Sequence, residues 1–249
     1  MASSLLFTAM AGLETASREL DTIAGNVSNA DTIGYAAAQT AALALPYTGG
    51  NSPSGADVTP LDEGTDIAEG PIQRTGAPLD LAVKGGWLLV QTPDGGVALT
   101  RNGILLQGAD GTLVTQDGDP VLDVNEQPIN LPSLKDLQIS QDGTISGIPA
   151  SSDVQQASVY ATLFIAATPQ NARLVPLGGT LYGLQNNVQP TQAANAQVMQ
   201  GYLEGSNVDP VQSMVDMISG TRSFQLLSQI VASSGNAEQS LNQVLTAAS

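Results

Sequence analysis

The chain has 249 residues, of which 42% are hydrophobic and 12% charged, and it contains neither cysteine nor histidine. It is too apolar for a disordered chain, and its 26 glycines and 14 prolines are too many for an all-helical protein. The 7 basic residues against 23 acidic residues give a net charge of −16, which disfavours nucleic acid and anionic membranes as partners. The lack of cysteine and histidine excludes disulfides, zinc–thiolate sites and histidine-based catalysis.

The first 30 residues do not read as a signal peptide. An unbroken apolar stretch is missing, since charged residues interrupt the segment: Glu14, Arg18, Glu19 and Asp21. No apolar run reaches the roughly 18 residues that a membrane-spanning helix needs. We therefore expect no membrane span, and export, if it occurs, without a cleaved signal.

The N-terminal segment shows a heptad pattern. Leucine or valine recurs every seven residues, with a second apolar series three residues later: Leu6, Leu13, Leu20 and Val27, then Ala9, Ala16 and Ile23. This spacing is typical of the seam of a coiled coil. It predicts a helix from near Ser3 to about Asn29, and a helix packed only on its own domain is the alternative.

The C-terminal segment opens with a helix-start signal that allows two registers. Either Ser206 caps the helix with Asp209 at the third position, or Asp209 caps it ahead of Pro210. Apolar positions then follow: Val211, Met214, Val215, Met217, Ile218, Phe224, Leu227, Ile230, Val231, Leu241 and Val244. The small residues among them weaken an isolated helix but let a neighbouring backbone approach closely. A helix of this kind should need partners to stay ordered.

The middle of the chain reads as β structure. Residues 46–64 have little periodicity and predict an extended connector or loop. Short apolar runs follow, up to about Leu184, separated by pairs typical of hairpin turns: Asp94-Gly95, Asn102-Gly103, Asp110-Gly111, Asp117-Gly118 and Asp142-Gly143. We expect an antiparallel body whose core is built from Leu, Val, Ile and Ala, with Trp87 inside it.

The sequence carries no recognisable catalytic or cofactor motif. It has neither a phosphate-binding loop nor the acidic spacing of a calcium-binding loop, and a Ser–Lys dyad would have to use Lys84 or Lys135. Paired carboxylates for glycoside hydrolysis stay possible, although no pair stands out. We predict that the protein is not an enzyme and that it uses no metal, cofactor or small-molecule substrate.

Both ends and part of the middle resemble one family. Residues 20–35 (LDTIAGNVSNADTIGY) and 201–225 (GYLEGSNVDPVQSMVDMISGTRSFQ) are similar to the N- and C-terminal signatures of bacterial flagellar rod and hook proteins. The strands around GGWLLVQTPDGGVALTRNG resemble those of the same family's β-domain. Residues 205–210 and the short length look most like the proximal rod subunits. The chain departs from relatives at Ala36–Ala38, Gln225 and Ser228.

The resemblance implies an α+β fold in which the terminal helices pair as a coiled-coil-like inner layer of a tube, with an antiparallel β-domain outside. The implied domains are the N-terminal helix (1–35), an extended connector (36–72), the β-rich outer domain (73–190), and a return segment with the C-terminal helix (191–249). The implied function is a structural subunit of the rod in the flagellar basal body, which transmits torque across the periplasm. The implied partners are copies of itself, other rod subunits and the flagellar type III export apparatus.

The resemblance also implies which residues form the assembly interface: Leu6, Leu13, Leu20, Ile23, Val27, Asn26, Asn29, Gly34, Tyr35, Ser206, Asn207, Val208, Val211, Val215, Ile218, Phe224, Leu227, Ile230 and Leu241. Asn26 and Asn29 would satisfy carbonyls at the helix end, Gly34 would take a positive φ, and Tyr35 would anchor the outgoing chain. We expect both ends to be largely disordered in the free subunit and to fold on assembly.

Three other functions remain open on the sequence. The chain could be a distal rod or hook subunit of the same family, although no long insert follows the connector. It could be a secreted β-domain that binds a glycan or a protein and oligomerises through its helical ends. An enzyme acting on the cell wall is the third, and it would depend on a carboxylate pair.

Overall fold

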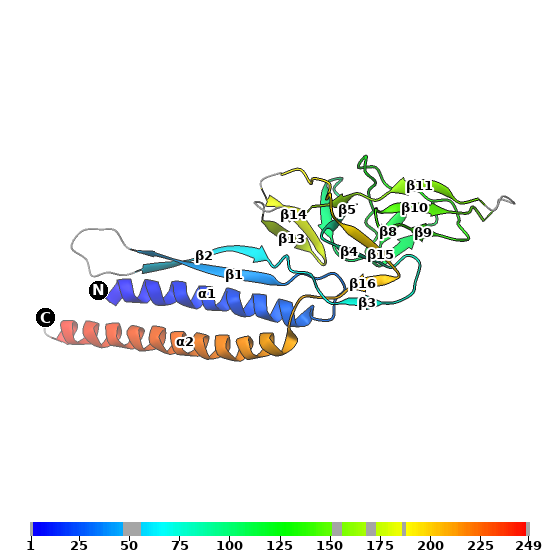
Figure 1. The fold of residues 1–249 in the computed structure, drawn as a ribbon. Coiled ribbons are helices and arrows are strands. Elements are labelled where there is room, and N and C mark those ends of the chain that lie inside the picture. The colour runs from blue at the N-terminus through cyan, green and yellow to red at the C-terminus, as the bar shows by residue number, and fades with distance from the viewer. Residues whose placement is uncertain (1, 47–55, 151–155, 168–172, 186–187, 248–249) are drawn as a thin grey trace. The chain divides into compact units, whose positions relative to one another are not determined.

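The computed structural model describes residues 2–46, 56–150, 156–167, 173–185 and 188–247. Within these ranges the chain has one helix at each end and strands between them (Figure 1). The helices are α1 (Ala2–Ser28) and α2 (Pro210–Ala247). The strands of the first half are β1 (Ala38–Pro46), β2 (Ala56–Thr65), β3 (Ile72–Arg74), β4 (Leu81–Lys84), β5 (Trp87–Gln91), β6 (Val97–Thr100), β7 (Leu105–Gln107) and β8 (Leu113–Thr115). Those of the second half are β9 (Gln138–Ile139), β10 (Thr144–Gly147), β11 (Ser158–Thr162), β12 (Ile165–Ala166), β13 (Leu174–Gly178), β14 (Leu181–Leu184), β15 (Gln197–Gln200) and β16 (Tyr202–Glu204). The fold class is α+β, as the sequence predicts.

The chain divides into two compact units. Unit 1 comprises Met1–Ser28, Ala38–Gly64 and Asp209–Ser249, and unit 2 comprises Asn29–Ala37 and Thr65–Val208. Unit 1 holds both helices and the pair of strands β1 and β2, and β1 lies along α1 (Figure 1). The sequence predicts only an extended connector here. Strand pairing adds partners for backbone groups that an isolated extended chain would leave to water.

The helix α1 begins and ends within one residue of the expected positions, and α2 begins at one of its two expected starts. The carboxylate of Asp209 accepts hydrogen bonds from the backbone N–H of Val211 at 2.9 Å and of Gln212 at 3.1 Å, so Asp209 is the cap and Pro210 the first helical residue. The hydroxyl of Ser206 instead accepts from Val208 N–H at 3.2 Å. Of the two registers that the sequence allows, the structure has the second.

The strand pairs described in unit 2 are antiparallel, and the largest sheet has the order β12-β5-β6-β14-β13. The strand β5 is buried on both faces. Leu88 and Val90 belong to a core cluster made of leucine, valine, isoleucine and alanine, and Trp87 and Leu89 belong to a second cluster. The expected aliphatic core is confirmed for the first cluster, as is the burial of Trp87, but the second cluster also contains the aromatic residues Phe164 and Tyr182.

The β structure continues beyond residue 190, where the sequence predicts a return segment. The strand β15 pairs with β4 and β16 pairs with β3, so residues 197–204 complete sheets that begin near residue 72. The apolar residues of these strands, Val198 and Leu203, are buried. Their partners lie more than 100 residues away in sequence, which is why local patterning does not identify them.

Four of the five expected turns are confirmed. Gly95, Gly111, Gly118 and Gly143 all have positive φ and lie between paired segments. Hydrogen bonds from Thr112 and Thr144 hold the pKa of Asp110 and Asp142 below the ordinary value. The Asn102-Gly103 prediction is wrong, because β6 and β7 belong to different sheets. Gly103 instead lies so close to Leu81 that a Cβ atom would collide with the Leu81 carbonyl.

Candidate assembly surface and chain junction

In unit 1 the two helices lie side by side and antiparallel (Figure 1). A Cβ atom at Gly12 would lie 3.7 Å from Leu227, and one at Gly220 would lie 2.9 Å from Leu20 and 3.9 Å from Ile23. Ala9 and Ala16 are buried in α1. Small residues thus permit the close approach of the two backbones that the sequence predicts.

Over residues 210–233, the less exposed residues of α2 recur with the spacing of one helix face: Ser213, Met217, Gly220, Phe224, Leu227, Ser228 and Val231. This spacing places them along one face, and the contacts of Gly220 and Leu227 show that this face lies against α1. Leu13, Leu20, Ile23 and Val27 of α1 are half-buried. The heptad pattern of α1 thus corresponds to a face that packs against another helix. Pairing of the two helices is established, whereas the coiled-coil geometry is not.

The opposite face of α2 is also apolar and is exposed. It carries Val211, Met214, Val215, Ile218, Leu226 and Ile230, whose exposed fractions range from 45% to 72%. Val211 lies nine residues before Gly220, and Ile218 lies nine residues before Leu227. Nine residues make about two and a half helical turns, so these pairs point in opposite directions. We call this set of six side chains the outer face of α2.

In unit 2 the segment after α1 and the segment before α2 lie against each other. Gly34 N–H donates to Glu204 O at 2.8 Å, and Asn207 N–H donates to Tyr35 O at 3.3 Å. The side chain of Asn207 accepts from Ala37 N–H at 2.7 Å and donates to the carbonyls of Asp66 and Ala68 at 3.1 and 3.0 Å. These are the two terminal signatures, so the structure brings them together although some 170 residues separate them in sequence.

Two further side chains of unit 2, Arg101 and Tyr182, form hydrogen bonds with these segments. Arg101 donates to the carbonyls of Ala68 and Ile67 at 2.8 and 2.9 Å and pairs with the carboxylate of Glu204 at 3.1 Å. The hydroxyl of Tyr182 accepts from Ala36 N–H at 2.8 Å and donates to Ala36 O at 3.2 Å. We call residues 34–37, 65–71 and 204–208, together with Arg101 and Tyr182, the junction.

Burial dominates the electrostatics of the junction. Both side chains of the Arg101–Glu204 pair are at most 4% exposed. Burial raises the pKa of Glu204, an effect that Arg101 and Gly70 N–H oppose without cancelling. Burial also raises the pKa of Tyr182 to about 12, against a hydrogen bond from Ala36 that lowers it. The guanidinium of Arg101 lies 4.1 Å from the centre of the Trp87 ring, an attractive cation–π geometry.

The expected interface residues fall into different environments. Val211, Val215, Ile218 and Ile230 lie on the outer face of α2, whereas Leu227 lies against α1 and Phe224 is half-buried on the inner face. Gly34 and Ser206 are buried in the junction, and Tyr35, Asn207 and Val208 are half-buried there. The side chains of Leu6 and Leu241 lie outside the described part of the structure.

The structure shows contacts of both asparagines that are expected near the end of α1. The amide of Asn26 donates to Ala38 O and accepts from Ala38 N–H, both at 2.9 Å, because β1 returns beside α1. Asn29 opens a turn, in which its carbonyl and side chain accept hydrogen bonds from Thr32 at 3.1 and 3.2 Å. Gly34 has the expected positive φ of 71°.

Sequence reasoning missed Arg101, Glu204 and Tyr182. Arg101 follows the apolar run of β6, and Glu204 follows Leu203 in β16. In a chain with only 12% charged residues, a charge directly at the end of a strand is a signal that could have pointed to a buried pair. The sequence could not have indicated that these two charges meet.

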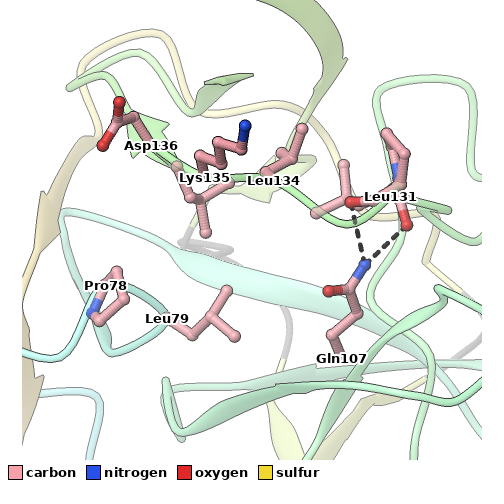
Figure 2. A pocket seen from close by; sticks show the side chains of 9 residues that line it. Pro78, Leu79, Gln107, Leu131, Leu134, Lys135 and Asp136 are labelled. Carbon is pink, nitrogen blue, oxygen red and sulfur yellow. Dashed lines mark hydrogen bonds between the residues drawn. The ribbon is translucent and has the colours of Figure 1, made fainter. Parts of the chain in front are cut away.

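A pocket of about 330 Å³ in unit 2 offers little chemistry (Figure 2). Nine residues line it: Pro78, Leu79, Gln107, Leu131, Pro132, Leu134, Lys135, Asp136 and Leu137. The amide of Gln107 donates to the carbonyls of Leu131 and Pro132 at 2.6 and 3.3 Å, as the dashed lines in Figure 2 show. None of the nine is a serine, so this pocket does not supply a nucleophile for Lys135.

Comparison with protein families gives three matches in chain order. Residues 6–35 match the Flagella basal body rod protein family, and residues 82–147 match the Flagellar hook protein FlgE/F/G D1 domain. Residues 199–244 match the Flagellar basal body rod FlgEFG protein C-terminal family. The first match ends within the junction stretch 34–37, and the third includes the stretch 204–208. Among the described residues, no helix is both long and apolar enough to cross a membrane.

Similar proteins cover nearly the whole chain. The flagellar basal-body rod protein FlgF of Salmonella typhimurium is 32% identical over 97% of this chain and 98% of its own length. That of Escherichia coli is 33% identical with the same coverage. The flagellar basal-body rod protein FlgG of Agrobacterium fabrum is 30% identical over 91% of this chain and 93% of its own length. With this identity along its length and three family matches in order, the chain belongs to the flagellar basal-body rod protein family.

Proposed function

We propose that this structural subunit of the basal-body rod assembles through its terminal helices into a tube, in the proximal part of the rod. Residues 205–210 and the short length support the proximal position. In this proposal unit 1 forms the inner helical layer and unit 2 the outer β-domain. Strand pairing by β16 favours a domain boundary near residue 208 instead of residue 190. The role is mechanical and non-catalytic: the tube transmits torque across the periplasm.

The outer face of α2 is the observation that carries this proposal. Six large apolar side chains on one helix face are exposed, while the inner face already lies against α1. Large apolar side chains that gather on one exposed helix face are costly to leave in water, and they mark an interaction site. Burying one such side chain fully contributes about 1.5–3 kcal/mol, so several half-exposed ones contribute a few kcal/mol per contact.

A contact of that size is weak alone, because association costs at least about 4 kcal/mol of translational and rotational freedom. Many repeated contacts are therefore needed for a stable array. A face that meets a different surface on the next copy gives a head-to-tail contact, which builds a helical filament when it does not close into a ring. This is the geometry of a shaft.

The proposed interface keeps the residues that the family resemblance implies, with two roles. Val211, Val215, Ile218 and Ile230 would contact neighbouring subunits directly. Those that lie in the helix seam or the junction would shape the interface from within the chain: Leu13, Leu20, Ile23, Asn26, Val27, Asn29, Gly34, Tyr35, Ser206, Asn207, Val208, Phe224 and Leu227. The roles of Leu6 and Leu241 stay predictions.

The test replaces the outer face without touching the inner one. The double variant Val215→Asn/Ile218→Asn should lose incorporation into rods and motility, while the far-UV circular dichroism of the dilute subunit stays that of the parent chain. Val159→Asn is the matched control, since Val159 of β11 is 68% exposed but lies in unit 2. Normal rods from the double variant would contradict the proposal.

Other rod subunits and the flagellar type III export apparatus are the proposed partners. Deletion of residues 1–35 should abolish assembly of a rod subunit, whereas a ligand-binding β-domain would keep its ligand. Imaging of a labelled chain in isolated basal bodies separates a proximal from a distal position. Label found only in the distal rod or the hook would replace the proximal assignment.

A further inference from the structure

We propose that Arg101 is a positioning residue for assembly, because it holds the three stretches of the junction in one arrangement. This inference rests on the proposed function, since it concerns how the subunit is prepared for the rod. The stretches 34–37, 65–71 and 204–208 lie next to the points where the chain enters or leaves unit 2. The arrangement of these three stretches therefore fixes the points from which the chain continues into the helices and strands of unit 1.

Arg101 contacts two of the three stretches directly. One guanidinium nitrogen donates to Ala68 O and lies 3.1 Å from the Glu204 carboxylate, and the other donates to Ile67 O. The planar guanidinium offers its donors in a fixed fork, so one rigid group sets the distance between residues 67–68 and residue 204. Its third nitrogen, Nε, has no hydrogen-bond partner among the described residues, and the group stacks on Trp87.

Glu204 connects Arg101 to the third stretch, residues 34–37. Its carboxylate accepts from Gly70 N–H at 2.9 Å, and its backbone carbonyl accepts from Gly34 N–H at 2.8 Å. Without Arg101, a carboxylate that is 3% exposed would keep one backbone N–H as its hydrogen-bond partner within the described structure. A charge left in that state moves toward water, and the carbonyl that holds Gly34 moves with it.

A purely stabilising role predicts a different outcome from a positioning role. Replacing a buried ion pair by apolar residues is often neutral or favourable for stability. Such a replacement restores burial, but it does not restore the hydrogen bonds from Arg101 to Ala68 O and Ile67 O. The double variant Arg101→Met/Glu204→Leu therefore separates stability from positioning.

The experiment compares amide hydrogen exchange of the full-length dilute subunit with its incorporation into rods. In Arg101→Met we expect exchange at residues 34–37 and 66–70 to be at least about tenfold faster, since each stretch loses direct or relayed hydrogen bonds. Incorporation should fall in parallel. Arg101→Lys should behave similarly, because an ammonium lacks the fork. The double variant should regain thermal stability but neither slow exchange in the junction nor assembly.

Arg74→Met is the matched control, because Arg74 of β3 is exposed and pairs with Tyr202, two residues before Glu204. It should exchange and assemble as the parent chain does. Parent-like exchange in the junction of Arg101→Lys or of the double variant would overturn the positioning role. Normal assembly of the double variant, despite fast exchange in its junction, would overturn it as well. If the parent chain and Arg74→Met fail to form rods, the proposed function is overturned, and the exchange data still decide the role of Arg101 within the subunit.

Discussion

At the scale of single residues, Tyr182 shows how one polar atom ties distant segments together. Its ring packs edge-on against Trp87 with ring centres 5.4 Å apart, and its hydroxyl bonds both backbone groups of Ala36. The side chain is 2% exposed, so a broken hydrogen bond there would leave a backbone group unsatisfied. The stability of the junction should therefore depend on this hydroxyl and on its ionisation.

We expect Tyr182→Phe to lower the free energy of unfolding by about 1–3 kcal/mol. In the parent chain the Tyr182 pKa is raised from 10.0 to about 12, so the phenol ionises in the unfolded chain before it does in the folded one. Stability should therefore fall as pH rises from 10 to 12, by up to about 3 kcal/mol, and this loss should be smaller in Tyr182→Phe. Urea unfolding at several pH values measures both effects.

Tyr160→Phe provides the control for this prediction, since Tyr160 is a half-buried tyrosine of β11 outside the junction. This variant keeps Tyr182 and its hydrogen bonds to Ala36, so it should retain the loss of stability that Tyr182 causes between pH 10 and 12. An equal loss of stability between pH 10 and 12 in the parent chain and in Tyr182→Phe would show that other groups cause it.

Gly34 is a second residue whose position in the fold determines which amino acid can stand there. Its φ is 71°, and a Cβ atom there would collide with the backbone nitrogen of Asn102. We expect Gly34→Ala to destabilise unit 2 by more than about 2 kcal/mol, through both backbone strain and the collision. Gly25→Ala, at an α1 position where a Cβ meets nothing within 4 Å, should stabilise by up to about 1 kcal/mol. Thermal unfolding of the two variants should shift in opposite directions.

At the scale of elements, the helix pair depends on close approach at Gly220. A Cβ atom at this position would lie 2.9 Å from Leu20, and any larger side chain would push the helices apart. We expect Gly220→Leu to weaken the pairing by about 1–3 kcal/mol despite the better helix propensity of leucine. Gly235→Leu should raise helicity, because a Cβ atom there meets nothing within 4 Å. The melting of the helical circular dichroism signal distinguishes the two variants.

The free subunit is predicted to have weaker helices than the rod. The helix α2 has Gly220 and Gly235 in its interior and is apolar on two faces, so it should depend on contacts for its order. We expect the helical circular dichroism signal per residue to fall as the subunit is diluted and to return on assembly. A signal that stays constant at full helicity down to the lowest concentration would contradict the prediction.

At the scale of the whole molecule, the net charge of −16 opposes the packing of identical copies. Screening shortens the range of this repulsion from about 30 Å at 0.01 M salt to about 8 Å at 0.15 M salt. We therefore expect assembly to become more favourable as ionic strength rises over this range, to a similar extent with sodium and potassium chloride. Light scattering measures the critical concentration, and a salt-independent value would show that charge plays no part.

The local features of the fold follow from the sequence because their causes are local. The heptad spacing of α1, the cap at Asp209 and the Asp-Gly turns depend on residues within a few positions of each other. The prediction of a hairpin turn at Asn102-Gly103 is wrong for a different reason. A glycine there is needed for contact with Leu81, and a pair of residues that forms turns elsewhere does not indicate such a contact.

By itself, the sequence determined the α+β class, the positions of both helices, most turns and membership of the rod family. The tertiary structure alone decided that Arg101 meets Glu204, that Asn207 meets Ala37, and that residues 197–204 complete sheets begun near residue 72. It also decided which apolar face of α2 lies against α1 and which is exposed. The reason is physical: periodicity and turn chemistry depend on neighbours along the chain. Partners more than 100 residues apart are chosen by packing and by the need to satisfy buried polar groups.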